Sequence, residues 1–99
     1  MTDLLKAENF LPHVDKVFRV KGSSHALTLV QVDHRQRQES ERLIGARDPF
    51  NLIFRGPPGN VLREGLYLLE VENGTSFELY VMPIHTPLRD RQDYQASFN

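Results

Sequence analysis

The sequence predicts an all-β fold of about six antiparallel strands, closed into a small barrel or folded as a sandwich, with a short N-terminal helix. Two observations support this prediction: short segments alternate between apolar and polar residues, and Gly, Pro and Asn gather between them. The connections are too short for the helical crossovers of parallel strands, so we expect a meander of antiparallel neighbours. A chain of 99 residues suits one domain, residues 1–99, with a single core.

The first segment, residues 3–14, is expected to form a short helix over one open end of the sheet. Apolar side chains recur in it at helical spacing, at Leu4, Leu5, Phe10, Leu11 and Val14. Pro12 keeps the helix in short pieces, because proline is tolerated only in a first turn.

Strands are then expected at 17–20, 25–33, 50–55, 66–72, 75–82 and 94–98. Residues 21–24 should turn the first strand into the second, and the Gly-Pro-Pro-Gly run at 56–59 follows the third as a rigid turn. Between the second and third strands, the excursion over 34–47 is mostly polar, and we expect it to be a mobile, solvated loop.

The clearest local signal is the hairpin around Asn73-Gly74, and its turn type decides which side chains face the core. A two-residue turn would bury Glu70 among apolar residues. A three-residue loop with Gly74 in the left-handed region pairs Val71 with Thr75 and turns Glu70 outward. Burial of an unpaired carboxylate is costly, so we predict the three-residue loop. The inward face is then Tyr67, Leu69, Val71, Phe77, Leu79 and Val81.

In this register Leu66, Leu68, Tyr80 and Met82 lie on the side away from the core. They form a larger apolar cluster than an open sheet normally shows to water. Two coverings are considered: the N-terminal helical segment, or a protein interface formed by self-association or by docking to a larger assembly.

Charge and composition narrow the function classes. The formal net charge of −1 offers no overall positive field for nucleic acid. The absence of cysteine removes disulfides, thiolate metal ligands and thiol nucleophiles. No apolar run approaches the roughly 18 residues of a membrane span, and the N-terminus has no secretion signal. We expect a cytoplasmic protein whose partners are proteins, not nucleic acid or membranes.

No catalytic, metal or cofactor site is expected. Four histidines are the only candidate transition-metal ligands, His13, His25, His34 and His85, and the sequence gives no reason for three of them to converge. Glu70 and Glu78 share the outward face, where a solvated surface explains them better than an acid and base pair does. The serines lack the glycines of a nucleophile elbow. We therefore do not expect an enzyme.

The loop also carries Arg35, Arg37, Arg42 and Arg47, which could grip a carboxylate or phosphate surface. Acidic residues interleave with them and largely neutralise the charge. Two readings stay open: a solvated loop, or a partner-binding arm that becomes ordered on contact.

A series of short motifs runs through most of the chain: FRV at 18–20, LVQV at 29–32, PFNLIFRG at 49–56, GLYLL at 65–69, LYVMPI at 79–84 and YQASFN at 94–99. This series resembles a family of short bacterial proteins catalogued as a domain of unknown function. The resemblance implies a gene neighbourhood shared with tail-fibre-like or tail-collar-like proteins, and hence an accessory or structural part in a phage-tail-like assembly. One departure is Asp15, where members of that family place glycine after the first helix.

Two functions follow as expectations. The first is a non-catalytic protein-interaction or structural accessory module, whose surface includes Leu66, Leu68, Tyr80, Met82, Arg35, Arg37 and Arg42. The alternative is a small β-barrel that binds an apolar small molecule between its sheet and the N-terminal helix.

Overall fold

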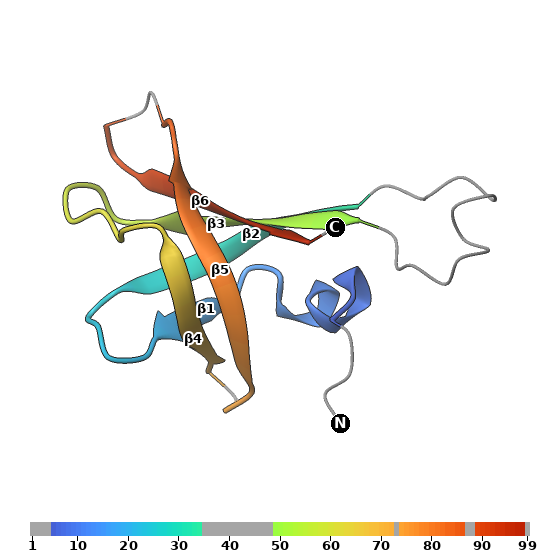
Figure 1. Cartoon of the computed structure of the whole chain (residues 1–99). Coiled ribbons are helices and arrows are strands. Elements are labelled where there is room, and N and C mark those ends of the chain that lie inside the picture. The colour runs from blue at the N-terminus through green and yellow to red at the C-terminus, as the bar shows by residue number, and fades with distance from the viewer. Residues whose placement is uncertain (1–4, 35–48, 73, 87–88, 99) are drawn as a thin grey trace.

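Six antiparallel strands form one closed barrel (Figure 1). The computed structural model describes residues 5–34, 49–72, 74–86 and 89–98. The strands are β1 (Val17–Val20), β2 (Ala26–His34), β3 (Phe50–Gly56), β4 (Gly65–Val71), β5 (Ser76–Ile84) and β6 (Gln92–Phe98). The predicted fold class is confirmed, and the barrel is favoured over the sandwich.

The order of strands around the barrel is β1-β2-β3-β6-β5-β4, so the predicted simple meander is wrong. Two meanders of three strands, β1 to β3 and β4 to β6, are joined where β3 pairs with β6 and where β1 pairs with β4. These two long-range pairings close the barrel and leave none of its six strands with an open edge. Local sequence patterns specify each hairpin but not this long-range pairing.

The β4–β5 hairpin has the predicted three-residue turn. The Val71 N–H donates to the carbonyl oxygen of Thr75 at 2.7 Å, and the Gly74 N–H donates to the carbonyl oxygen of Val71 at 2.8 Å. Gly74 has a φ of 95°, a conformation that glycine adopts without strain. The pairing of Glu70 with Ser76 continues this register along the hairpin. The predicted assignment of inward and outward faces is therefore confirmed.

The barrel interior is filled by apolar side chains from all six strands. Its core consists of Phe10, Phe18, Val20, Leu27, Leu29, Phe50, Leu52, Phe54, Leu62, Leu69, Val71, Leu79, Val81, Tyr94 and Ala96. Each of these residues is at most 5% exposed. Phe10 and Leu62 are the two core residues that lie outside the strands. They come from the two segments that close the barrel.

At one end, the predicted N-terminal helical segment forms two short 3₁₀ turns, η1 (Ala7–Asn9) and η2 (Leu11–His13), separated by Phe10. Pro12 lies in the first turn of η2, as its missing N–H requires. Phe10, between the turns, is completely buried, and its ring centroid lies 4.6 Å from that of Phe77 and 5.9 Å from that of Phe98. No helix in the described ranges is long and apolar enough to cross a membrane.

Phe10 enters the barrel where β5 and β6 diverge. The two strands pair over 82–84 and 93–95, whereas Phe77 lies near the start of β5 and Phe98 at the end of β6. The Phe10 ring packs against both. The prediction that the N-terminal segment covers an open end of the sheet is confirmed.

A β-bulge and a left-handed residue bring this segment onto β2. The register of β2 against β3 shifts between Leu29 and Gln31, so Val32 rather than Gln31 turns toward the core. The Leu29 carbonyl accepts a hydrogen bond of 2.6 Å from the Asp15 N–H. Asp15 has a φ of 73°, a conformation that suits glycine and that aspartate tolerates better than most residues. A glycine, which the sequence resemblance implies at this position, would adopt this conformation without strain.

The loop between β3 and β4 lies on the other side of the barrel from the 3₁₀ turns (Figure 1). Its Leu62 N–H donates to the hydroxyl oxygen of the buried Tyr94 at 3.0 Å. The ring of His25, at the start of β2, holds the carbonyl oxygen of Asn60 at 2.9 Å through Nε2 and the hydroxyl of Ser23 at 2.5 Å through Nδ1. In the neutral ring Nε2 carries the proton, because a carbonyl oxygen only accepts.

Candidate protein-interaction face

Leu66, Leu68 and Tyr80 form an exposed apolar patch on the outer face of the β4–β5 hairpin, called the β4–β5 patch below. Their exposed fractions are 61%, 43% and 48%. Leu66 lies directly opposite Tyr80, and Leu68 follows on the same face of β4. Scattered apolar residues are normal on a protein surface, whereas adjacent ones on paired strands are typical of a binding surface.

Met82, the fourth predicted member, is half-buried. It lies opposite Gln95 of β6, because β5 changes its partner from β4 to β6 after Val81. Met82 is therefore a marginal member of the patch. This change of partner depends on barrel closure and has no local sequence signal.

Residues 5–14, the part of the N-terminal segment that the structure describes, leave the β4–β5 patch exposed, so they are not its predicted covering. Phe10 is buried inside the barrel end, and Leu5 packs against the same core. Leu11 is 49% exposed. Phe10 and Leu5 therefore complete the interior at this end of the barrel, whereas Leu11 does not.

Acidic side chains border the patch. Glu78 lies opposite Leu68, Glu70 follows Leu68 along β4, and Glu64 precedes the strand on the same side. Two cations lie beside Glu70: Arg19 is its cross-strand partner on β1, and Lys21 donates its N–H to the Leu68 carbonyl at 2.9 Å and places its Nζ 3.3 Å from Oε2 of Glu70. Among these described neighbours, the three carboxylates against Arg19 and Lys21 leave one negative charge in excess, carried on the side of Glu64 and Glu78. Glu70 is engaged by Lys21, so the Glu70 and Glu78 carboxylates belong to a charged margin.

Tyr80 is tied to this border through its hydroxyl group, which donates a hydrogen bond to Oε2 of Glu64. The hydrogen bond to the Glu64 carboxylate, with desolvation and the negative charge of Glu64 adding to it, raises the pKa of Tyr80 above its usual 10.0. The phenol therefore stays neutral and its ring is held against Leu66. Sequence reasoning did not single out Glu64, which lies 16 residues from Tyr80.

Two of the histidines, His13 and His25, make contacts that support the fold. The His13 ring packs edge-on against Phe18, with centroids 6.1 Å apart, His25 anchors the β3–β4 loop, and His85 is exposed. His34 ends β2. Within the described residues, no three His, Cys, Asp or Glu side chains gather closely enough to hold a metal ion.

The predicted arginine arm lies outside the described residues. Arg35, Arg37, Arg42 and Arg47 all fall within 35–48. The hypothesis that this loop binds a partner stays a prediction from the sequence.

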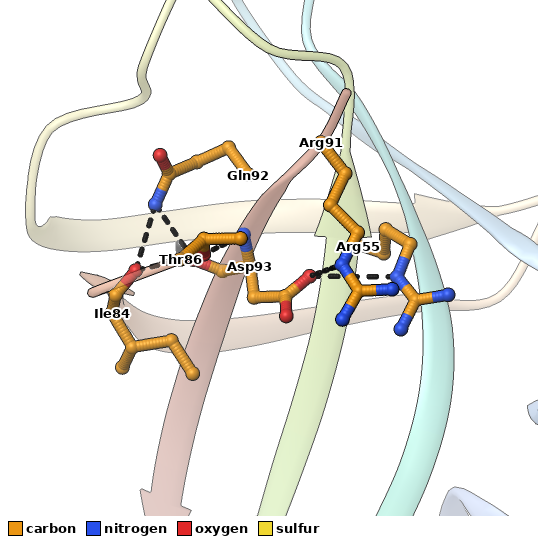
Figure 2. A network of polar contacts seen from close by, with 6 residues as sticks. All are labelled: Arg55, Ile84, Thr86, Arg91, Gln92 and Asp93. Carbon is orange, nitrogen blue, oxygen red and sulfur yellow. Dashed lines mark hydrogen bonds and ion pairs between the residues drawn. The ribbon is translucent and has the colours of Figure 1, made fainter. Parts of the chain in front are cut away.

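A second charged group, missed from the sequence, lies at the start of β6. The Nε atoms of Arg55 and Arg91 lie 3.4 and 3.5 Å from the same oxygen, Oδ1 of Asp93 (Figure 2). We call these three residues the Arg55–Asp93–Arg91 cluster. Arg55 and Asp93 are neighbours because β3 pairs with β6 over 38 residues of sequence separation. Only knowledge that β3 pairs with β6 would have placed these two residues side by side.

The backbone around Asp93 is fixed by its neighbours. The Asp93 N–H donates to Oγ1 of Thr86 at 3.0 Å, and that hydroxyl donates to the Ile84 carbonyl at 3.1 Å. The Gln92 amide donates to the carbonyls of Ile84 and Asp93 at 2.9 and 3.0 Å. These bonds join the end of β5 to the start of β6 (Figure 2).

Comparison with known proteins finds a family model described as a domain of unknown function (DUF6916), which matches residues 5–98. No curated protein matches the chain. No solved structure matches it either.

Proposed function

The chain belongs to this family of unknown function, and we propose from its geometry that the protein is a non-catalytic module that docks onto another protein through the β4–β5 patch. The observation that supports this proposal is the exposure of Leu66, Leu68 and Tyr80 on two paired strands. A polypeptide that covers these side chains removes their apolar surface from water and gains about 25 cal/mol per Å².

The patch fits a foreign partner better than a second copy of this chain. Two copies that met through this face would bring Glu64 and Glu78 toward the same groups of the partner copy, and such like-charge contacts disfavour association. A partner segment with apolar side chains flanked by Lys or Arg would match both the leucines and the acidic border. We propose that chemistry for the partner.

The alternative of an apolar small molecule held between the sheet and the N-terminal segment has less support. Phe10 occupies that position, completely buried and in contact with Phe77 and Phe98. A ligand there would have to displace a ring that belongs to the core.

The experiment compares three forms of the protein as bait in extracts of the native host, with bound proteins identified by mass spectrometry. Wild type is compared with Leu66→Glu, which places a charge in the patch, and with Leu11→Glu, which places the same charge on an exposed leucine of η2. A docking partner should be recovered by wild type and by Leu11→Glu and lost with Leu66→Glu. The phage-tail-like assembly implied by the sequence resemblance is the first place to look for it.

Light scattering supplies the second measurement. A monomer over micromolar concentrations is expected for the isolated protein. A stable dimer that Leu66→Glu dissociates would replace the foreign partner with a second copy. If wild type and Leu66→Glu recover the same proteins, the proposed face is wrong.

A further inference from the structure

The Arg55–Asp93–Arg91 cluster has two positive side chains and one negative side chain. Two guanidiniums share one carboxylate, and both are directed at the same atom, Oδ1. The cluster therefore has one uncompensated positive charge on the outer surface of β3 and β6. The side chains of Arg55 and Arg91 are 43% and 31% exposed, so this charge is accessible from outside.

Most hydrogen-bond donors of the two arginines are unused. A guanidinium has five N–H donors in a planar fork, and the contacts with Asp93 end on Nε in both residues (Figure 2). Within the described ranges, the terminal nitrogens make no other hydrogen bond or ion pair. Nε of Arg91 is itself buried without a hydrogen bond, although it lies 3.5 Å from Oδ1 of Asp93.

Asp93 positions the guanidinium groups of Arg55 and Arg91 in the absence of a ligand. Its main chain is held by Thr86 and Gln92, and its side chain is only 15% exposed. Both arginines thus lie in ion-pair contact with one fixed, half-buried carboxylate, at 3.4 and 3.5 Å. Pre-positioning of this kind reduces the ordering cost of binding an anion.

We propose that the Arg55–Asp93–Arg91 cluster is a binding site for a carboxylate, held by the terminal nitrogens of Arg55 and Arg91. A planar guanidinium matches a carboxylate oxygen pair in a bidentate arrangement. The single excess charge suits a monoanion, and the negative charge of Asp93 disfavours a phosphate dianion. This site lies on β3 and β6, apart from the β4–β5 patch, and does not depend on that patch's proposed function.

The test uses ¹⁵N-labelled full-length protein and follows the Nε–Hε NMR signals of Arg55 and Arg91. Acetate is titrated as the probe, inorganic phosphate as the competing chemistry and chloride as the ionic-strength control. Saturable shifts of both signals with acetate, and weaker or no saturation with phosphate, are expected. Linear shifts that chloride reproduces would overturn the site, and saturation by phosphate alone would overturn the preference for a carboxylate.

Arginine variants distinguish specific binding of acetate at the cluster from nonspecific attraction of acetate to a positively charged surface. Arg55→Gln and Arg91→Gln should each weaken acetate binding about tenfold or more, since each removes charge-assisted hydrogen bonds. Arg89→Gln removes an exposed arginine outside the cluster and should leave acetate binding unchanged. Equal losses in all three variants would show that nonspecific attraction, not this site, holds the anion.

A fourth variant tests the role of Asp93. Asp93→Asn removes the repelling charge, so phosphate binding should strengthen relative to acetate. An unchanged preference in a folded Asp93→Asn protein would contradict the charge argument. A capped glutamate peptide and a peptide with a free C-terminus then distinguish an acidic side chain from a terminal carboxylate as the source.

Discussion

We expect that replacement of Gly56, the last residue of β3, by alanine destabilises the protein. A Cβ at this position would lie 2.9 Å from Cδ2 of Leu27 and 3.3 Å from Cε1 of Tyr94. Leu27 is completely buried and Tyr94 is 1% exposed, so either side chain would have to shift within a close-packed core. Gly56 lies outside the left-handed region, so the backbone itself would accept alanine.

Two effects oppose each other in Gly56→Ala. Alanine restricts the unfolded chain, which alone would stabilise the protein by about 0.4–1 kcal/mol. Overpacking of a tight core costs about 1–3 kcal/mol. The contact of 2.9 Å is closer than real Cβ atoms tolerate, so overpacking should win. We expect a net loss of about 1–2 kcal/mol, or roughly 4–16 °C in Tm for a domain of this size.

Urea unfolding followed by circular dichroism measures the change as a lower midpoint with an unchanged slope. Leu27→Val removes the Cδ atoms of Leu27 and supplies the matched test. The double variant should be more stable than the sum of the two single changes predicts, by about 0.5–1 kcal/mol or more. Gly74→Ala is the comparison, because Gly74 has open space around it and a positive φ, so Leu27→Val should not rescue it. A Gly56→Ala protein as stable as wild type would refute the reasoning.

Three further outcomes follow from the described contacts. Phe10→Ala should lower the free energy of unfolding by about 3–5 kcal/mol, whereas Leu11→Ala, on an exposed side chain, should change it by less than about 0.5 kcal/mol in the same urea titration. Asp15→Ala should destabilise by about 1 kcal/mol, because alanine tolerates the left-handed conformation less well, and Asp15→Gly should be at least as stable as wild type; equal losses in both would contradict the strain argument. Glu64→Ala should return the pKa of Tyr80 toward 10.0, read from phenolate absorbance against a Tyr80→Phe blank. Folding raises the pKa of Tyr80, so the hydrogen bond from its neutral phenol to Glu64 stabilises the folded protein fully below pH 10.0. That contribution is lost as the pH rises through the raised pKa of the folded state.

The candidate interaction face could be predicted largely from the sequence. Once Gly74 was assigned the left-handed position of a three-residue turn, alternation placed Leu66, Leu68 and Tyr80 outside and Glu70 among the outward residues. Met82 was assigned less well, because its burial depends on pairing with β6 rather than on its own hairpin. The Arg55–Asp93–Arg91 cluster could not be found at all, because it joins strands far apart in the chain.

The sequence by itself determined the strands, the hairpin register and the conformations of the turns. These features depend on interactions among residues close together in the chain: the period of side chains along a strand, the missing N–H of Pro12 and the freedom of Gly74 at positive φ. Only the tertiary structure decided the strand order, the insertion of Phe10 into the barrel end and the meeting of Arg55 with Asp93. Those features depend on which distant strands pair when the barrel closes, and the side-chain pattern of an inward-facing strand is the same whichever neighbour it takes.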